Sequence, residues 1–203
     1  AKPHDLEKVV VPPYLPDHPK IRKELALYYD EVSRFDRCVG AVLNVLEDEG
    51  RADDTVVVFM SDNGMPFPRA KTTLYDSGIR TPFIVRWSGR TPANSVNRNL
   101  FSVVDLAPSL LSIAGLKPES MQGVDATKMF LNGSEKGRRH VFAEANWHDF
   151  EKFTRAVTDG RYKLIRNYYW DRPLWNSVDS INSITWQGMI ESRKDGRLTP
   201  AQE

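Results

Sequence analysis

The stretch at residues 53–64 reads DDTVVVFMSDNG. Its centre, residues 56–60, is a continuous run of apolar and mostly β-branched side chains, which is typical of a strand covered on both faces. A sheet covered in this way needs helices on its faces, so the run favours an α/β fold. The polar residues at 61–64 then follow a core strand, at the edge where ligands bind in open α/β sheets.

A long amphipathic helix is predicted directly before this strand, over residues 20–49, because apolar residues recur at steps of three and four. The stripe consists of Ile21, Leu25, Val32, Val39 and Leu46. Asp17 is the expected N-cap and Gly50 the expected stop. We expect this stripe to pack on the sheet and the single cysteine, Cys38, to be buried and unreactive.

Further strands of the same sheet are predicted at residues 82–87 and 100–103. A shorter helix follows over residues 106–114, with Asp105 as its cap. Before the long helix, the proline-rich arm at residues 1–19 carries enough apolar residues to indicate that it is packed rather than free. Helices and core strands in this order predict a mixed sheet with covering helices.

The pattern changes after residue 116. A strand is predicted at residues 141–145, and a hairpin at 153–165 turns at Asp159-Gly160, a pair suited to a tight hairpin turn. We therefore predict two parts. Residues 1–116 belong to an α/β domain, and residues 117–203 form a small antiparallel C-terminal subdomain that looks truncated.

Composition excludes several classes of protein. The chain has 28 Lys and Arg against 27 Asp and Glu, a net charge of +1, which argues against a dedicated nucleic-acid-binding protein. Its longest apolar run, residues 56–60, is far shorter than the ~20 residues of a membrane-spanning helix. One cysteine rules out an internal disulfide framework and a cysteine-only metal cluster. We expect neither a nucleic-acid nor a membrane partner.

The candidate chemistry lies just after the first strand. Asp62 and Asn63 offer a carboxylate and an amide carbonyl, the hard oxygen ligands that Ca²⁺ or Mg²⁺ takes. Lys71 follows on the same segment, and a cation beside a metal suits an anionic substrate. Taken alone, Asp-Asn-Gly is more often a simple turn with solvated side chains. The sequence around it decides between these two interpretations.

Residues 61–86, SDNGMPFPRAKTTLYDSGIRTPFIVR, together with the strand before them resemble the second metal-binding segment of the sulfatases, a family of the alkaline-phosphatase-like superfamily. The helices at 27–40 and 102–116 and the hairpin at 159–165 are also similar to sulfatase segments. The resemblance spans roughly residues 9–170. The form Asp-Asn-Gly-Met-Pro-Phe-Pro is closest to the sulfamidase, or heparan N-sulfatase-like, branch. The first part of the chain thus resembles the C-terminal part of the sulfatase catalytic domain.

The resemblance implies roles for particular residues. Asp62 and Asn63 would be two ligands of a single Ca²⁺, and Lys71 would contact the sulfate and assist the leaving group. Sulfamidases often place Arg at that position, and either cation serves. His148 could face the sugar substrate, although a surface loop histidine is the simpler interpretation.

The family's nucleophile is a formylglycine made from the Cys or Ser of a Cys/Ser-X-Pro-X-Arg motif. Cys38 does not match this motif, because Val39-Gly40 follows it. We expect the nucleophile segment and the remaining metal ligands upstream of Ala1, and the 203-residue chain alone to be inactive. The family implies a periplasmic, secreted or lysosomal-type compartment, although the start of this chain shows no signal peptide.

The sequence therefore predicts a sulfuric ester or sulfamate hydrolase acting on sulfated glycans, as in glycosaminoglycan degradation. Two alternatives stay open. One is a phosphatase or phosphonate hydrolase of the same superfamily, although an Asp-Asn pair without His favours one hard-metal site over two zinc ions. The other is a non-catalytic module that binds a glycan or an anion. The choice between N-sulfated and O-sulfated substrates, and the oligomeric state, stay open too.

Overall fold

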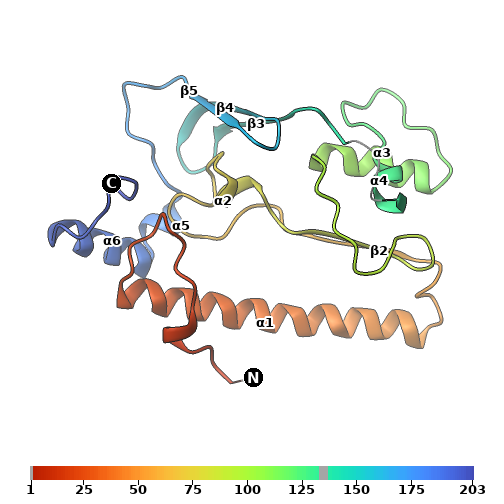
Figure 1. Cartoon of the computed structure of the whole chain (residues 1–203), viewed down its shortest axis with the longest axis horizontal. Helices are drawn as coiled ribbons and strands as arrows, with labels where there is room; N and C mark the ends of the chain where they lie inside the picture. Colours follow the sequence, from red (N-terminus) through yellow and green to blue (C-terminus); the bar gives the residue numbers. More distant parts are fainter. Residues whose placement is uncertain (1, 133–136) are drawn as a thin grey trace.

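The computed structural model describes residues 2–132 and 137–203 (Figure 1). Helices and two antiparallel sheets alternate along the chain, which confirms the predicted α/β class. The helices are α1 (Pro19–Asp48), α2 (Asp76–Ile79), α3 (Leu106–Ile113), α4 (Thr127–Asn132), α5 (Val178–Ile181) and α6 (Ile184–Lys194), with 3₁₀ turns η1 (Leu6–Lys8) and η2 (Val103–Asp105). The strands are β1 (Val56–Met60), β2 (Phe83–Trp87), β3 (Val141–Trp147), β4 (Glu151–Thr158) and β5 (Lys163–Asn167). Within the described ranges, no helix is long and apolar enough to cross a lipid bilayer.

Helix α1 follows the prediction closely, with one difference at its start. His18, not Asp17, is the N-cap: its Nδ1 accepts a hydrogen bond from the Lys20 amide at 3.2 Å. Asp17 instead forms an ion pair with Arg22, at 2.6 Å. At the other end the chain turns through Gly50 in the left-handed region, at φ +62°, as expected for a glycine stop.

The main hydrophobic core lies around the first half of α1. Ile21 and Leu25 are fully buried there, and Val9 and Leu15 of the N-terminal arm pack against them, so the arm is packed as predicted. Met189 of α6 closes the same cluster. Phe67 and Ala70, from the segment after β1, complete it: Figure 1 shows α6 and the arm gathered at this end of α1. The stretch that follows Asp62 and Asn63 is thus anchored in the core through Phe67 and Ala70.

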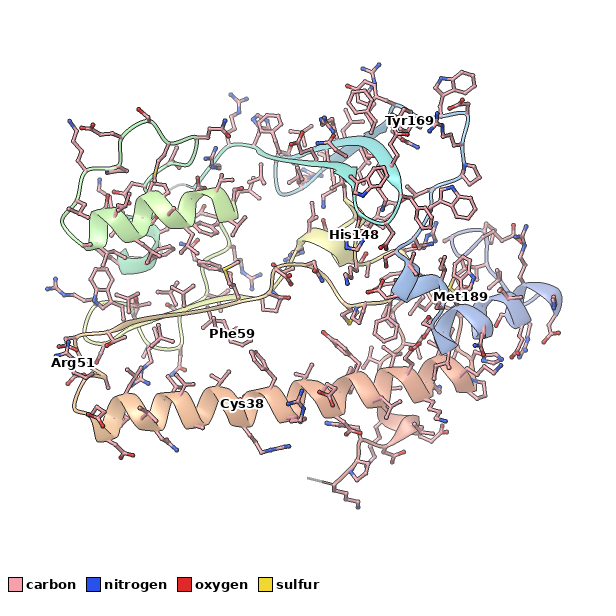
Figure 2. All side chains as sticks on the ribbon, turned by 180° about the vertical axis from the view of Figure 1, so that it is seen from behind. Cys38, Arg51, Phe59, His148, Tyr169 and Met189 are labelled. Atoms are coloured by element: carbon pink, nitrogen blue, oxygen red, sulfur yellow. The ribbon has the colours of Figure 1, made fainter. Side chains whose placement is uncertain are left out.

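The second half of α1 is much less covered than predicted. Only part of the stripe is buried, since Val32 is 50% exposed, and Cys38 lies on the exposed surface. Strand β1 touches this half through Phe59, whose ring lies 5.9 Å from that of Phe35 (Figure 2). Among the described residues this sheet has two strands, β1 and β2, and so narrow a layer cannot cover a 30-residue helix. The prediction of a buried Cys38 is therefore wrong.

Exposure of Cys38 leads to a simple expectation. In the folded 203-residue chain, an aromatic disulfide reagent should label Cys38 nearly as fast as it labels a small model thiol, because access to the sulfur is free. Absorbance of the released thiolate gives the rate. A rate that rises more than about 10-fold on adding denaturant would show that the thiol is protected in the folded chain.

The two sheets differ in their surroundings. β1 and β2 pair antiparallel beside α1, with Val58 opposite Val85. β3, β4 and β5 form an antiparallel sheet whose β4–β5 hairpin turns at Asp159-Gly160, as predicted. The predicted strand at 100–103 is wrong: Leu100 makes one isolated bridge to Arg138, and η2 follows.

Asp105 explains this difference. It occupies the N-cap position of α3, as predicted, but its carboxylate makes no capping bond to that helix. It accepts instead from the amides of Ser102, at 3.3 Å, and Val124, at 2.8 Å, and from the guanidinium of Arg138. These bonds fold residues 102–105 into a 3₁₀ turn rather than a strand.

Candidate functional site

Asp62 and Asn63 lie in the loop directly after β1, as predicted. The Asp62 side chain is exposed, and its carboxylate has no hydrogen bond or ion pair within the described chain. The Asn63 amide nitrogen donates to the Gly64 carbonyl at 2.8 Å, which turns the amide oxygen away from that contact. Hard oxygen ligands from two side chains are therefore available at the end of β1. The five residues of this strand are all part-exposed, so the prediction that it is covered on both faces is wrong for the described chain.

Gly64 lets this loop lie tightly on the segment that begins α2. The Gly64 amide donates to the Gly78 carbonyl at 2.9 Å, and a Cβ at either glycine would collide with backbone oxygens. Between these glycines the chain runs through Phe67 and Ala70 in the core. The local sequence thus fixes residues 61–79 as one compact segment, which we call the site segment.

Lys71 lies in the middle of the site segment, and its side chain is engaged. Its Nζ forms an ion pair with Oδ2 of Asp179, on α5, at 2.6 Å. Burial by itself raises the pKa of Asp179, but hydrogen bonds from Lys71 and Ser177 lower it, and the net pKa lies below the usual value. The pair is part-exposed, so a competing anion can reach the ammonium.

His148, in the turn between β3 and β4, is also paired. Its Nδ1 lies 3.0 Å from Oδ2 of Asp149, and the Val178 amide at the start of α5 donates to the same oxygen at 2.7 Å. The hydrogen bond from Val178 is the main cause that lowers the pKa of Asp149. Asp149 thus connects the β3–β4 turn to α5. The same helix carries Asp179, the ion-pair partner of Lys71.

Two lysines of the C-terminal sheet hold the site segment from its other side. Lys152 of β4 donates from Nζ to the Thr72 carbonyl, at 2.7 Å, and to the Thr72 hydroxyl, at 2.9 Å. Lys163 of β5 binds the Leu74 carbonyl and pairs with Asp76. Burial lowers the pKa of Lys152, and the charge of Asp149 opposes that shift.

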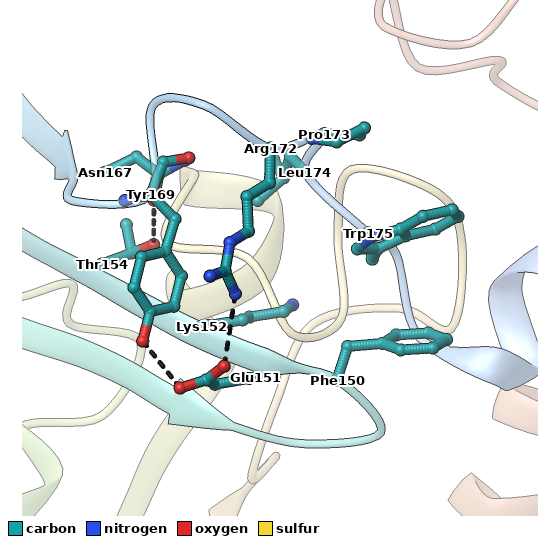
Figure 3. A pocket seen from close by; sticks show the side chains of 10 residues that line it. All are labelled: Phe150, Glu151, Lys152, Thr154, Asn167, Tyr169, Arg172, Pro173, Leu174 and Trp175. Carbon is teal, nitrogen blue, oxygen red and sulfur yellow. Dashed lines mark hydrogen bonds and ion pairs between the residues drawn. The ribbon is translucent and has the colours of Figure 1, made fainter.

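A cavity of about 180 Å³ opens beside Lys152, between the β4–β5 hairpin and the loop at residues 168–175 (Figure 3). Tyr169 and Arg172 both bind the Glu151 carboxylate, at 2.7 and 3.3 Å, on one side. Phe150 and Trp175 stand on the other, with ring centroids 5.6 Å apart. Asp62 and Asn63 do not line this cavity, so it is separate from the candidate metal ligands.

A divalent cation fits the chemistry of Asp62 and Asn63 but needs more ligands. Ca²⁺ takes six to eight oxygens, and in the described ranges no group of three or more His, Cys, Asp or Glu side chains could hold a metal. The unpaired Asp62 carboxylate is what a partial metal site would present. Asp179 and Lys152 bind the site segment directly, at Lys71 and Thr72, and Asp62 and Asn63 lie at the start of the same segment.

Comparisons with known proteins define the class. The family described as Sulfatase matches residues 3–116, and the family described as N-sulphoglucosamine sulphohydrolase, C-terminal, matches residues 69–184. The first match alone covers more than half of the chain. The chain belongs to the sulfatase family, a family of hydrolases, and the second match confirms the resemblance to the sulfamidase branch.

Individual relatives agree with this assignment. The chain is 38% identical over 198 residues to an ulvan-active sulfatase of Formosa agariphila, covering 96% of this chain and 33% of that protein. It is 30% identical over 213 residues to the human N-sulphoglucosamine sulphohydrolase, covering 97% of this chain and 41% of the relative. The chain therefore spans about a third to two fifths of the length of these curated relatives.

Solved structures support the fold. A protein solved in complex with its substrate, D-glucosamine-2-N,6-O-disulfate, superposes with a TM-score of 0.61 at 23% identity, covering 88% of this chain and 38% of that one. The PsFucS1 sulfatase from Pseudoalteromonas sp. superposes with a TM-score of 0.52 at 21% identity, covering 72% of this chain and 34% of that one. Both matches confirm the predicted sulfatase-like architecture.

Sequence reasoning missed Asp179, Asp149 and Lys152. Asp149 stands next to the predicted His148, so proximity in sequence was an available signal. Asp179 lies 108 residues from its partner Lys71, and Lys152 lies 80 residues from its partner Thr72. No local pattern marks such long-range partners.

Proposed function

We propose that this chain supplies one side of the active site of a hydrolase that cleaves sulfate esters or sulfamates on sulfated glycans. The observation that carries the proposal is the site segment: one compact stretch presents two unpaired hard oxygens and, nine residues after Asp62, an ammonium group. These groups suit an anion such as sulfate that is bound at two points. Some of its oxygens would contact a metal held by Asp62 and Asn63, and another would contact the Lys71 ammonium.

The residues divide the work as follows. Asp62 and Asn63 would hold a divalent cation, for which we propose Ca²⁺ because both donors are hard oxygens. When bound, such a cation neutralises negative charge on the sulfate oxygens. Lys71 places its positive charge beside the bridging atom and stabilises the charge that develops on it. His148, oriented by Asp149, would hold a hydroxyl of the sugar.

The test joins this chain to the part of a sulfatase that it does not span. In a chimera, residues 1–203 replace the matching third of the ulvan-active sulfatase of Formosa agariphila. The chimera should hydrolyse an aryl sulfate or N-sulfated glucosamine in the presence of Ca²⁺, and chelation should abolish turnover. The 203-residue chain alone should show none, because its sequence contains no Cys/Ser-X-Pro-X-Arg motif.

Matched substrates separate the alternatives. An aryl phosphate cleaved faster than the aryl sulfate would assign the site to phosphate chemistry. A folded chimera that binds the sulfated sugar without turnover would favour the binding module. The Asp62→Asn variant keeps the shape of the side chain and removes its charge, so it should weaken the response to Ca²⁺ without altering the melting temperature.

A further inference from the structure

We propose that Lys152 is a positioning residue for Lys71, acting through the backbone of Thr72. The inference deepens the proposed function, because it rests on Lys71 serving as the cation at the sulfate. Nothing in the motif around Lys71 points to Lys152, which lies on β4, in the C-terminal sheet.

Lys152 is a buried cation without a carboxylate partner among the described residues. It is only 8% exposed, yet its ammonium donates to two oxygens of a single residue, the carbonyl and hydroxyl of Thr72. Burying an ammonium costs free energy unless its donors are satisfied. A merely space-filling role would be served better by an apolar side chain, so the two bonds to Thr72 are the feature that needs explaining.

Thr72 adopts a conformation that a β-branched residue rarely takes. Its φ is +68°, in the left-handed region, and Arg69 has a φ of +63° on the other side of Lys71. Backbone strain of this kind persists only where surrounding contacts enforce it. Lys152 enforces it at Thr72, and Asn176 does so at Arg69, where its amide oxygen accepts from the Arg69 amide at 2.9 Å.

These contacts bracket Lys71 on both sides. Thr72 follows Lys71 directly, so its conformation sets the direction in which the Lys71 side chain leaves the backbone. Asp179 then binds the Lys71 ammonium at 2.6 Å. If Thr72 relaxed to an ordinary extended or helical φ, the Lys71 side chain would leave in another direction and the ion pair would break. Lys152 therefore controls where the Lys71 charge lies.

Lys163 is the matched control. It also reaches from the C-terminal sheet to the site segment, but it binds Leu74 and Asp76, beyond the strained residues. A change at Lys163 removes a tether of the same chemical type without touching Thr72. An effect specific to position 152 is then an effect on the Lys71 backbone and not on general docking of the sheet.

The first experiment needs no activity. Side-chain ¹⁵N NMR of lysine ammonium groups in the 203-residue chain should show an ordered, ion-paired Lys71. Lys152→Met should abolish that order, Lys163→Met should leave it, and adding Thr72→Gly to Lys152→Met should restore it in part, because glycine adopts a positive φ without strain. An ordered Lys71 in Lys152→Met would overturn the inference. Should that variant unfold, Lys152→Ala, which also removes both hydrogen bonds to Thr72, gives the same comparison.

The second experiment measures turnover in the chimera. Lys152→Met should lower kcat about 10- to 100-fold, the scale of a displacement near 1 Å, and Lys163→Met less than about 3-fold. Combining Lys152→Met with Lys71→Ala should cost little more than Lys71→Ala alone, whereas independent structural damage would multiply. Full activity in Lys71→Ala would remove Lys71 from the proposed site, while the NMR result would still decide whether Lys152 positions its side chain.

Discussion

Replacing Lys71 by alanine in the chimera should lower kcat on aryl sulfate by about 10²- to 10³-fold, the usual cost of removing one preorganised group that stabilises developing charge. The loss should appear in kcat more than in KM, because the ammonium acts on the charge of the departing atom, which is largest in the transition state. Steady-state kinetics over a range of substrate concentrations separates the two constants.

Lys71→Arg is the matched control. It keeps the positive charge, and the guanidinium can pair with Asp179 as the ammonium does. We expect it to retain activity within about 10-fold, since part of the geometry changes while the charge remains. An alanine variant as active as the parent would remove Lys71 from the site. An arginine variant as impaired as alanine would show that position matters more than charge.

The sequence predicted those features that depend on local order along the chain. Helix α1, strand β1 and the Asp159-Gly160 hairpin are each encoded by a continuous pattern, so periodicity and turn chemistry were sufficient. The position of Asp62 and Asn63 after β1 follows from the same logic, because a strand's end is marked where the apolar run stops.

What failed depends on contacts across the chain. Cys38 is predicted to be buried because an apolar stripe needs cover, but it is exposed. The sequence of a helix does not determine how much of that helix the sheet covers. The predicted strand at 100–103 does not form because the Asp105 carboxylate accepts hydrogen bonds from Ser102, Val124 and Arg138, which fold this segment into a turn. The roles of Lys152 and Asp179 could not be predicted for the same reason, because their partners are distant in sequence and close in space.

The Asp105 network should be among the largest single contributions to stability. Its carboxylate is 1% exposed and receives two bonds from Arg138, at 2.7 Å from Nε and 2.5 Å from Nη2. Arg138→Met leaves that charge buried without its partner, which should lower the free energy of unfolding by about 3 kcal/mol. Urea denaturation of the 203-residue chain at pH 7 measures the loss.

The pH dependence of this loss distinguishes a charge effect from a packing effect. Burial alone would raise the pKa of Asp105, but hydrogen bonds from Arg138, Val124 and Ser102 lower it, so the folded-state pKa lies below the unfolded value of about 3.9. The stabilisation is therefore present above about pH 4 and is lost as the pH falls through the folded-state pKa. Once Asp105 is protonated, the missing guanidinium costs much less, so parent and Arg138→Met stabilities should converge in acid.

Asp105→Asn combined with Arg138→Met removes both charges and should recover part of the stability at pH 7. A difference that stays constant from pH 7 to pH 3 would mean that Arg138 stabilises the fold through its packing and not through the buried carboxylate.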